Sequence, residues 1–391
     1  MTLEERISDT FVGKFGRESE LIVRASGRIN IIGEHTDYNE GFVLPAAIDK
    51  YIYFAVAKNG RRICRFWADD IEESAELDLD NIQSGDQLWA NYLFGILQQF
   101  QKLGVSLEGF DVAFGGNLPI GSGMSSSAAM EVGMASVVKA LFSVDIGKKE
   151  IALLAQRSSH QFIGVPCGIM DQFASIMGQK DQVIRLDCRT LSHDYIPFHL
   201  GDYRVVMINS KVSHSLASSE YGTRVKECRA GVDILRQYYP GIVSLRDVSL
   251  QQLEQHRADL PDVVYKRCHY VVAENDRLLR ACDALEEEDI ELLGTLLNQT
   301  HEGLRDEYEV SAPELDFLVD FAQTYGGVAG SRIMGGGFGG CSINLVRKDR
   351  VDAFIADIID AYRNAFNVEG EAYKVAAVDG TRPVSPGVGI G

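Results

Sequence analysis

The segment from Gly27 to Gly41 concentrates polar chemistry in a short stretch that reads G-R-I-N-I-I-G-E-H-T-D-Y-N-E-G. It holds Arg28 before an isoleucine-rich run, and Glu34, His35 and Asp37 after it. Residues 21–25 (L-I-V-R-A) and the isoleucines predict a buried strand, so the polar group falls where that strand ends in a loop. Loops carried by rigid strands commonly hold binding and catalytic residues. The pattern therefore predicts a functional site.

A second candidate is Asp171, in the segment C-G-I-M-D-Q-F at 167–173. A carboxylate among apolar neighbours is expensive to bury unless a cation or a hydrogen-bond donor stabilises its charge. Arg28 is a candidate partner, because its guanidinium would keep Asp171 ionised. The alternative is that Asp171 only caps a helix that starts near Gln172.

A third candidate is the serine-rich segment at 119–129, P-I-G-S-G-M-S-S-S-A-A, between a predicted strand at 110–114 and a predicted helix at 128–142. Its small residues let backbone amides approach an anion, and the following helix directs unpaired N–H groups and its positive dipole end to the same place. These features predict a phosphate-binding loop, in which one serine would ligate Mg²⁺ or add a donor. The alternative is a serine-rich cap on an ordinary helix.

Five glycines in six residues, G-G-G-F-G-G at 335–340, precede a predicted strand at 341–346. Glycine adopts positive φ without steric penalty and allows close backbone approach. The segment predicts contact with another loop or a ligand, and a purely structural turn is the alternative.

The amino-acid composition limits the classes of molecule that the protein could bind. The 391 residues include 38 basic and 56 acidic ones, for a formal charge of −18, which disfavours nucleic acid and anionic membranes as partners. An anionic substrate would then need a local positive field from an arginine, a metal or a helix N-terminus. The seven dispersed cysteines never form C-x-x-C, which argues for a reducing compartment and against a disulfide framework or a zinc site. With no apolar N-terminal run, a cytoplasmic protein is the expectation.

Helical and strand patterns are mixed rather than strictly alternating, which favours an α+β fold over a doubly wound sheet. Strands are expected at 43–57 and 63–67, with Asn59-Gly60 as the turn of a β-hairpin between them. A helix is expected at 88–103, and mostly helical structure from 249 to 325. The length suffices for about two domains, which we place at 1–195 and 196–391.

Taken together, these segments resemble the galactokinase family, within the larger group of small-molecule kinases that includes the homoserine, mevalonate and phosphomevalonate kinases. The first segment is similar to the family signature G-R-V-N-L-I-G-E-H-T-D-Y-N-x-G, the second to its C-G-I-M-D-Q, the third to P-x-G-x-G-L-S-S-S-A and the fourth to G-G-G-F-G-G-C. The similarity continues through 218–221 and 308–316, so it covers nearly the whole chain. The first motif is specific to the family, whereas the serine and glycine loops identify the wider group.

The resemblance implies a two-domain GHMP kinase fold with its active site in the interdomain cleft. It implies a monomer that phosphorylates α-D-galactose at O1, with ATP and Mg²⁺. Asp171 would face the anomeric hydroxyl, either as general base or only as an orienting group, with Arg28 beside it. Sugar hydroxyls would be held by Glu34, His35, Asp37, Tyr221 and the Gly168 backbone. The nucleotide would be held by Gly121, Ser122, Gly123, Met124, Ser125, Ser126 and Ser127, with Ser126 as a metal ligand.

The chain departs from the family pattern most consequentially at Ser159, twelve residues before Asp171, where relatives commonly have a glutamate associated with Mg²⁺. Weaker Mg²⁺ dependence or affinity is therefore expected. Two rival functions stay open. One is a kinase of the same fold acting on N-acetylgalactosamine, arabinose or galacturonate. The other is a non-catalytic galactose sensor, which Ser159 keeps open although the retained Arg28, Asp171 and serine loop favour catalysis.

Overall fold

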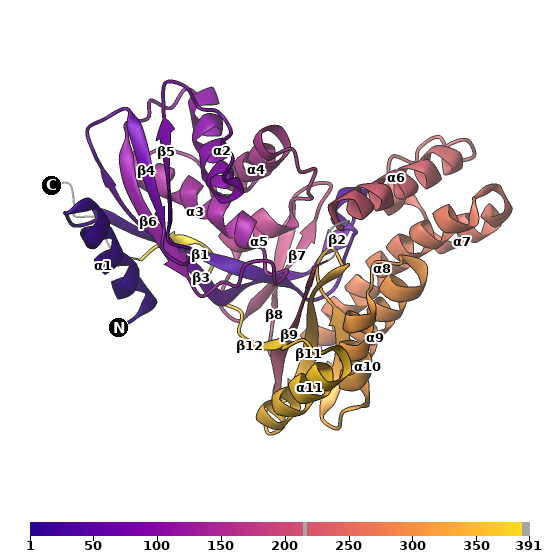
Figure 1. Ribbon diagram of the computed structural model, residues 1–391. Coiled ribbons are helices and arrows are strands. Elements are labelled where there is room, and N and C mark those ends of the chain that lie inside the picture. Colours follow the sequence, from indigo (N-terminus) through magenta and orange to yellow (C-terminus); the bar gives the residue numbers. More distant parts are fainter. Residues whose placement is uncertain (214–216, 385–391) are drawn as a thin grey trace.

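The structure is a computed structural model that describes residues 1–213 and 217–384. The first half of the chain, indigo to magenta in Figure 1, forms one lobe, and most of the second half, orange to yellow, forms another beside it. Both lobes contain helices together with largely antiparallel sheets, so the expected α+β fold is confirmed.

A six-stranded sheet in the order β13-β1-β3-β6-β4-β5 forms the centre of the first lobe. Neighbouring strands are antiparallel except β4 and β6, which are parallel. The strands are β1 (Leu21–Asn30), β3 (Pro45–Lys58), β4 (Ile63–Ala68), β5 (Glu73–Asp78), β6 (Phe110–Gly116) and β13 (Arg382–Pro383).

Helices cover both faces of this sheet, which explains why β3 is apolar at consecutive positions. Phe54 and Val56 point into the main core, whereas Tyr53 and Ala55 pack on the other face with Phe11 of helix α1. The main core is closed by four further helices. The five helices are α1 (Leu3–Phe15), α2 (Leu88–Lys102), α3 (Ser126–Leu141), α4 (Lys148–Ser158) and α5 (Met170–Met177).

The prediction of a β-hairpin across Asn59-Gly60 is wrong. The chain does turn there, with φ of 67° at Gly60, but β6 lies between the two strands and pairs with both. Asp111 of β6 is fully buried and accepts hydrogen bonds from Asn59 Nδ2 (2.9 Å) and from Arg65 of β4 (2.8 Å). A turn dipeptide reverses the chain locally, but the burial of β6 and the partners of Asp111 decide which strands pair.

A four-stranded antiparallel sheet in the order β10-β11-β9-β12 forms the second lobe. Its face with Val206 and Ile208 packs on α10 and α11, and its face with Val205 and Met207 joins the main core of the first lobe. The elements are β9 (Tyr203–Ser213), β10 (Val328–Ile333), β11 (Gly339–Arg347), β12 (Glu371–Val375), α9 (Ile290–Glu302), α10 (Pro313–Thr324) and α11 (Val351–Phe366).

Three helices, α6, α7 and α8, extend from this lobe as an arm (Figure 1). Their bounds are α6 (Ala217–Leu235), α7 (Leu250–Gln255) and α8 (Asp262–Glu286). A small sheet of β2 (Phe42–Val43), β7 (Gln182–Asp187) and β8 (His193–Pro197) completes the fold. Short 3₁₀ turns occupy Asp37–Asn39, Leu245–Asp247 and Arg257–Asp259, and π-helical turns occupy Ser159–Ile163 and Gly303–Glu307.

We propose that the two domains divide near residue 195, with the last described strand returning to the first domain. β13 pairs with β1 (Val23 opposite Pro383), so the chain ends its described course in the first sheet. Within residues 1–213 and 217–384, no helix is both long enough and apolar enough to span a bilayer.

Candidate active site

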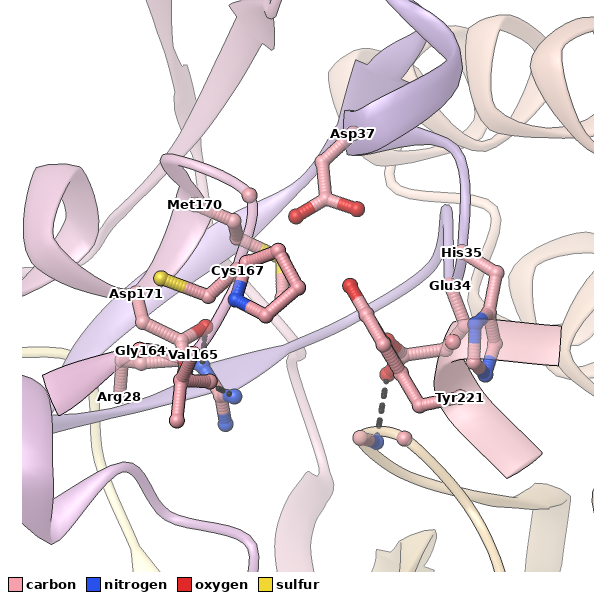
Figure 2. A pocket seen from close by; sticks show the side chains of 15 residues that line it. Arg28, Glu34, His35, Asp37, Gly164, Val165, Cys167, Met170, Asp171 and Tyr221 are labelled. Atoms are coloured by element: carbon pink, nitrogen blue, oxygen red, sulfur yellow. Dashed lines mark hydrogen bonds and ion pairs between the residues drawn. The ribbon is translucent and has the colours of Figure 1, made fainter. Parts of the chain in front are cut away.

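A cleft of about 360 Å³ brings together all the residues that the sequence assigned to catalysis and sugar binding (Figure 2). These are Arg28, Glu34, His35, Asp37, Gly168, Asp171 and Tyr221. The cleft is also lined by Gly164, Val165, Pro166, Cys167, Met170, Gly222, Gly335 and Gly336. It is therefore built from both the N-terminal and the C-terminal parts of the chain.

Arg28 and Asp171 form a bidentate ion pair on one wall of the cleft. Arg28 Nε lies 2.8 Å from Asp171 Oδ1, and Nη2 lies 2.9 Å from Oδ2. Burial alone would lower the pKa of Arg28, but the adjacent Asp171 raises it above its ordinary value. Asp171 lies in the first turn of α5, whose N-cap residue is Ile169. The alternative in which Asp171 serves only as a helix cap is therefore not supported.

A β-bulge in β1 turns Arg28 toward this wall. The pairing register with β3 shifts between Ser26 and Arg28, and such bulges re-aim the side chains that follow them. Ser26 is buried and fastens the bulge to α5, because its Oγ donates to Ser175 O (3.1 Å) while Ser175 Oγ donates to Ser26 O (2.7 Å). Strand and helix thus hold the two charged residues in fixed positions.

His35 lies in the loop after β1 with φ of 61°. Its Nδ1 is 2.8 Å from the Tyr38 hydroxyl, which is 2.6 Å from the Tyr308 hydroxyl. Burial, with a smaller effect from Arg224, lowers the pKa of His35 to about 3, so the ring is neutral at physiological pH. Its Nε2 is buried without a hydrogen-bond partner in the described chain, which suits a ligand contact.

The Asp37 carboxylate lies in direct contact with Gly168 at the cleft. A Cβ added to Gly168 would lie 1.6 Å from Asp37 Oδ2, so only glycine fits beside this carboxylate. Burial raises the pKa of Asp37 to about 7, and the nearby negative charge of Asp171 adds to this effect. Asp37 is therefore partly protonated near neutral pH in the free protein.

Glu34 and Tyr221 form the opposite side of the cleft. Glu34 Oε1 accepts a hydrogen bond from Gly335 N (3.0 Å), drawn as a dashed line in Figure 2, and another from Arg332 Nη1 (3.0 Å). Tyr221 comes from α6, and its ring centroid is 5.6 Å from that of His35. Sequence reasoning gave Arg332 no role, because its only local signal is its place just before the glycine segment.

The serine loop lies between β6 and α3, next to the ion pair. Ser125 occupies the N-cap position with φ of 59°, but its side chain does not cap the helix. Instead its Oγ donates to Asp171 Oδ2, and Gly123 O accepts from Arg28 Nη1 at 2.5 Å. The interpretation as an ordinary serine cap is therefore wrong for Ser125. Ser126 and Ser127 form the first turn of α3 and are partly exposed.

Two residues of this loop face inward. The Met124 side chain is fully buried, and Ser122 Oγ donates to Pro119 O (2.9 Å). Gly121 and Gly123 adopt positive φ. The loop also approaches the glycine segment, because a Cβ on Gly340 would lie 3.9 Å from Ser122 O. The expected close approach of the glycine segment to another loop is confirmed at Gly337, where a Cβ would lie 2.2 Å from Val310 O.

An apolar pocket opens beside Ser126 and was not recognised from the sequence. Its walls include Trp89, Phe114, Ile120 and Met130. Trp89 packs on Phe114 with ring centroids 5.5 Å apart. In the sequence, Trp89 is one of several apolar positions of a helix, and this pattern does not distinguish a binding surface from core packing.

The described residues near the serine loop offer few grouped anionic ligands for Mg²⁺. Among the described residues, no three His, Cys, Asp or Glu side chains are grouped so that they could hold a metal ion. Ser159 is buried, and its Oγ donates to Glu131 Oε1 (2.6 Å). Mg²⁺ often binds through one or two protein ligands together with phosphate oxygens and water, so Ser126 at the start of α3 fits that sparse role.

Comparisons with known proteins agree with this geometry. A model of the galactokinase galactose-binding signature matches residues 9–58, and models of the GHMP kinase N-terminal and C-terminal domains match residues 91–179 and 281–364. The structure superposes on Methanococcus jannaschii mevalonate kinase with a TM-score of 0.66 at 18% identity, over 93% of this chain and all of that one. The fold and site therefore define a GHMP kinase.

More specific matches follow. A galactokinase of a Roseiflexus species is 41% identical over 96% of this chain and 95% of its own length, and one of Thermotoga neapolitana is 39% identical over 93% and 99%. The crystal structure of Lactococcus lactis galactokinase complexed with galactose matches with a TM-score of 0.92 at 32% identity, over 97% and 99% of the two chains. The chain belongs to the galactokinase family and is a sugar kinase.

Proposed function

We propose that this protein transfers the γ-phosphoryl group of MgATP to O1 of α-D-galactose, giving galactose 1-phosphate and ADP. The observation that carries the proposal is the Arg28–Asp171 ion pair, which lies between the hydroxyl-binding loop and the serine loop. In the step, O1 forms a bond to the γ-phosphorus while the bond from that phosphorus to the bridging oxygen of ADP breaks. The proton of O1 leaves to Asp171 or to water.

We consider two roles for Asp171, that of a general base and that of a group that only orients the nucleophile. In both, its carboxylate accepts a hydrogen bond from the O1 hydroxyl and aligns an oxygen lone pair with phosphorus. The Arg28 guanidinium would stabilise negative charge on the transferring group. Ser125 and Arg28 already donate to Asp171, and together they hold its carboxylate in place in the free protein.

The loop after β1 supports recognition of a neutral sugar. Glu34 and Asp37 offer carboxylate oxygens as acceptors, His35 offers Nε2, and Tyr221 and the Gly168 backbone complete the wall. A site whose polar groups are satisfied only by a particular set of hydroxyls rejects epimers, because a wrong epimer leaves a buried group unpaired.

For the nucleotide, we propose that the first turn of α3 and the loop at 121–127 bind the phosphates through backbone amides and serine hydroxyls. The apolar pocket at Trp89 and Phe114 then lies where the adenine base would pack, next to Ser126. Ser126 would hold Mg²⁺, which when bound neutralises phosphate charge.

The decisive experiment measures ADP release by the purified protein with galactose, glucose, N-acetylgalactosamine, arabinose and galacturonate in turn. Galactose is expected to give the highest kcat/KM. Asp171→Asn should lose most turnover, while Asp194→Asn, which removes an exposed partner of Arg185, should keep it. Binding of galactose without ADP release would favour a sensor, and full turnover by Asp171→Asn would contradict the role of Asp171. A cytoplasmic location and a monomeric state remain predictions.

A further inference from the structure

The carboxylate of Glu34 is held on one oxygen only. Gly335 N and Arg332 Nη1 both donate to Oε1, each at 3.0 Å. Within the described residues, Oε2 has no hydrogen bond from the protein, although Glu34 lines the cleft. One oxygen is thus fixed by the protein, and the other is left for a ligand.

Arg332 is the residue that makes this arrangement rigid. It lies in β10, its side chain is fully buried, and it is the largest of the fully buried side chains. Its Nε donates to Ile31 O (2.8 Å), its Nη2 donates to Asn30 O, and its Nη1 also donates to Ile333 O (2.5 Å). The guanidinium therefore binds the end of β1, its own strand and Glu34 together.

This geometry differs from that of an ordinary structural ion pair. A carboxylate without a fixed partner can turn and exchange the oxygen that it offers to a ligand. Arg332 opposes this turning, because its guanidinium is itself fixed by the carbonyls of Asn30, Ile31 and Ile333 and donates a charge-assisted hydrogen bond to Oε1. A lysine in its place would supply the charge without the fork.

We propose that Arg332 is a positioning residue for sugar recognition, which acts by presenting Glu34 Oε2 to one hydroxyl of the sugar. This inference rests on the proposed function of the cleft. It assigns part of the hydroxyl selectivity to a residue in the C-terminal half of the chain that does not itself line the cleft.

The test compares Arg332→Met, Arg332→Lys and Glu34→Gln, with galactose and its 2-, 3-, 4- and 6-deoxy derivatives as substrates. In the wild-type protein, loss of the hydroxyl bound by Glu34 should raise KM about tenfold or more. That penalty should shrink for the same hydroxyl in Glu34→Gln and in Arg332→Met, and it should be partly restored in Arg332→Lys. KM for ATP should stay within about twofold.

A matched control is Arg267→Met. Arg267 is also a buried arginine, but it pairs with Glu227 (2.9 Å) and Glu309 (2.8 Å), outside the cleft. This variant should lose stability without changing the deoxygalactose pattern. The inference is overturned if Arg332→Met keeps the full wild-type pattern of KM values. It is also overturned if Arg332→Met weakens the contacts to all hydroxyls equally, because that result would indicate a general loosening of the site.

A crystal structure of the wild-type protein with galactose tests the same point if the Arg332 variants do not fold. We expect one sugar hydroxyl within hydrogen-bond distance of Glu34 Oε2 and Oε1 still bonded to Arg332. A sugar bonded through Oε1, or one without contact to Glu34, overturns the inference. Absence of any galactose phosphorylation by the wild-type protein would instead contradict the proposed function.

Discussion

Under the proposed role of Asp37 in sugar binding, galactose affinity should depend on pH in a direction that follows from the surroundings of this residue. Burial, together with the charge of Asp171, raises its pKa to about 7 in the free protein. A sugar hydroxyl makes a stronger hydrogen bond to an ionised carboxylate than to a protonated one, so binding should favour the ionised form. Galactose affinity should therefore rise as pH rises through 7, with release of a proton from Asp37.

The size of the effect follows from the fraction of Asp37 that is ionised. With a pKa of about 7, this fraction is about 0.9 at pH 8, about 0.1 at pH 6 and about 0.01 at pH 5. If only the ionised form bound galactose, KM would increase roughly 90-fold from pH 8 to pH 5, or about 2.7 kcal/mol at 1.36 kcal/mol per unit, and this is the upper limit of the effect. Near pH 6, binding should release about 0.9 proton per sugar.

Stability should move in the opposite direction. The unfolded chain has an ordinary Asp37 with a pKa of 3.8, so between about pH 4 and pH 7 the folded state binds more protons than the unfolded state. The free energy of unfolding of the sugar-free protein therefore falls as pH rises across this window. Thermal unfolding with and without galactose would show the ligand's stabilisation growing over the same range.

Two measurements check this reasoning. Initial rates of ADP release at saturating MgATP give KM for galactose from pH 5 to 8.5, and calorimetry in buffers of different ionisation enthalpy counts released protons.

Asp37→Asn should bind galactose more weakly and lose the pH dependence. Glu131→Gln is the control, because burial raises the pKa of Glu131 to about 7 as well. A flat KM profile, or one that disappears in Glu131→Gln, would refute the assignment to Asp37.

Two further predictions concern the nucleotide and the metal. Trp89→Ala should raise KM for ATP about tenfold with little change in KM for galactose, because it removes an aromatic wall of the pocket beside Ser126. Equal changes in both KM values would argue against adenine binding in this pocket. Ser159→Glu should tighten the Mg²⁺ titration of activity by adding a carboxylate ligand, and it should lower stability above pH 7, because two carboxylates would then meet at Glu131. An unchanged titration in a folded variant would contradict the first part.

The sequence predicted two parts of the site, one from the cost of burying single charges and one from a dense local motif. Arg28 and Asp171 are costly to bury alone, so each required a partner, and their pairing is what the structure contains. The loop with Glu34, His35 and Asp37 was recognisable because polar residues rarely follow a buried strand so densely. Strong periodicity likewise identified α2, predicted at 88–103 and observed at Leu88–Lys102.

The parts that were not predicted depend on contacts between distant segments. The Asn59-Gly60 turn is present, but β6, fifty residues further along, enters between the strands because Asp111 and its partners place it there. Ser125 fits an N-cap by type, and only the position of Asp171 shows that its hydroxyl is used elsewhere. Arg332 lies 298 positions from Glu34, and no local pattern joins them.

The charges around the cleft explain why Asp37 is the pH-sensitive group and which sugars suit the site. Arg28 neutralises Asp171 and Arg332 neutralises Glu34, each through direct hydrogen bonds. Among the described residues, no cation donates a hydrogen bond to Asp37; its carboxylate accepts one from Tyr38 N and interacts with Arg28 only through space. A neutral sugar can donate hydroxyl hydrogens to Asp37 and improve this balance. A sugar acid such as galacturonate would add an uncompensated anion in a region of low dielectric, so the charge arrangement favours galactose over this rival.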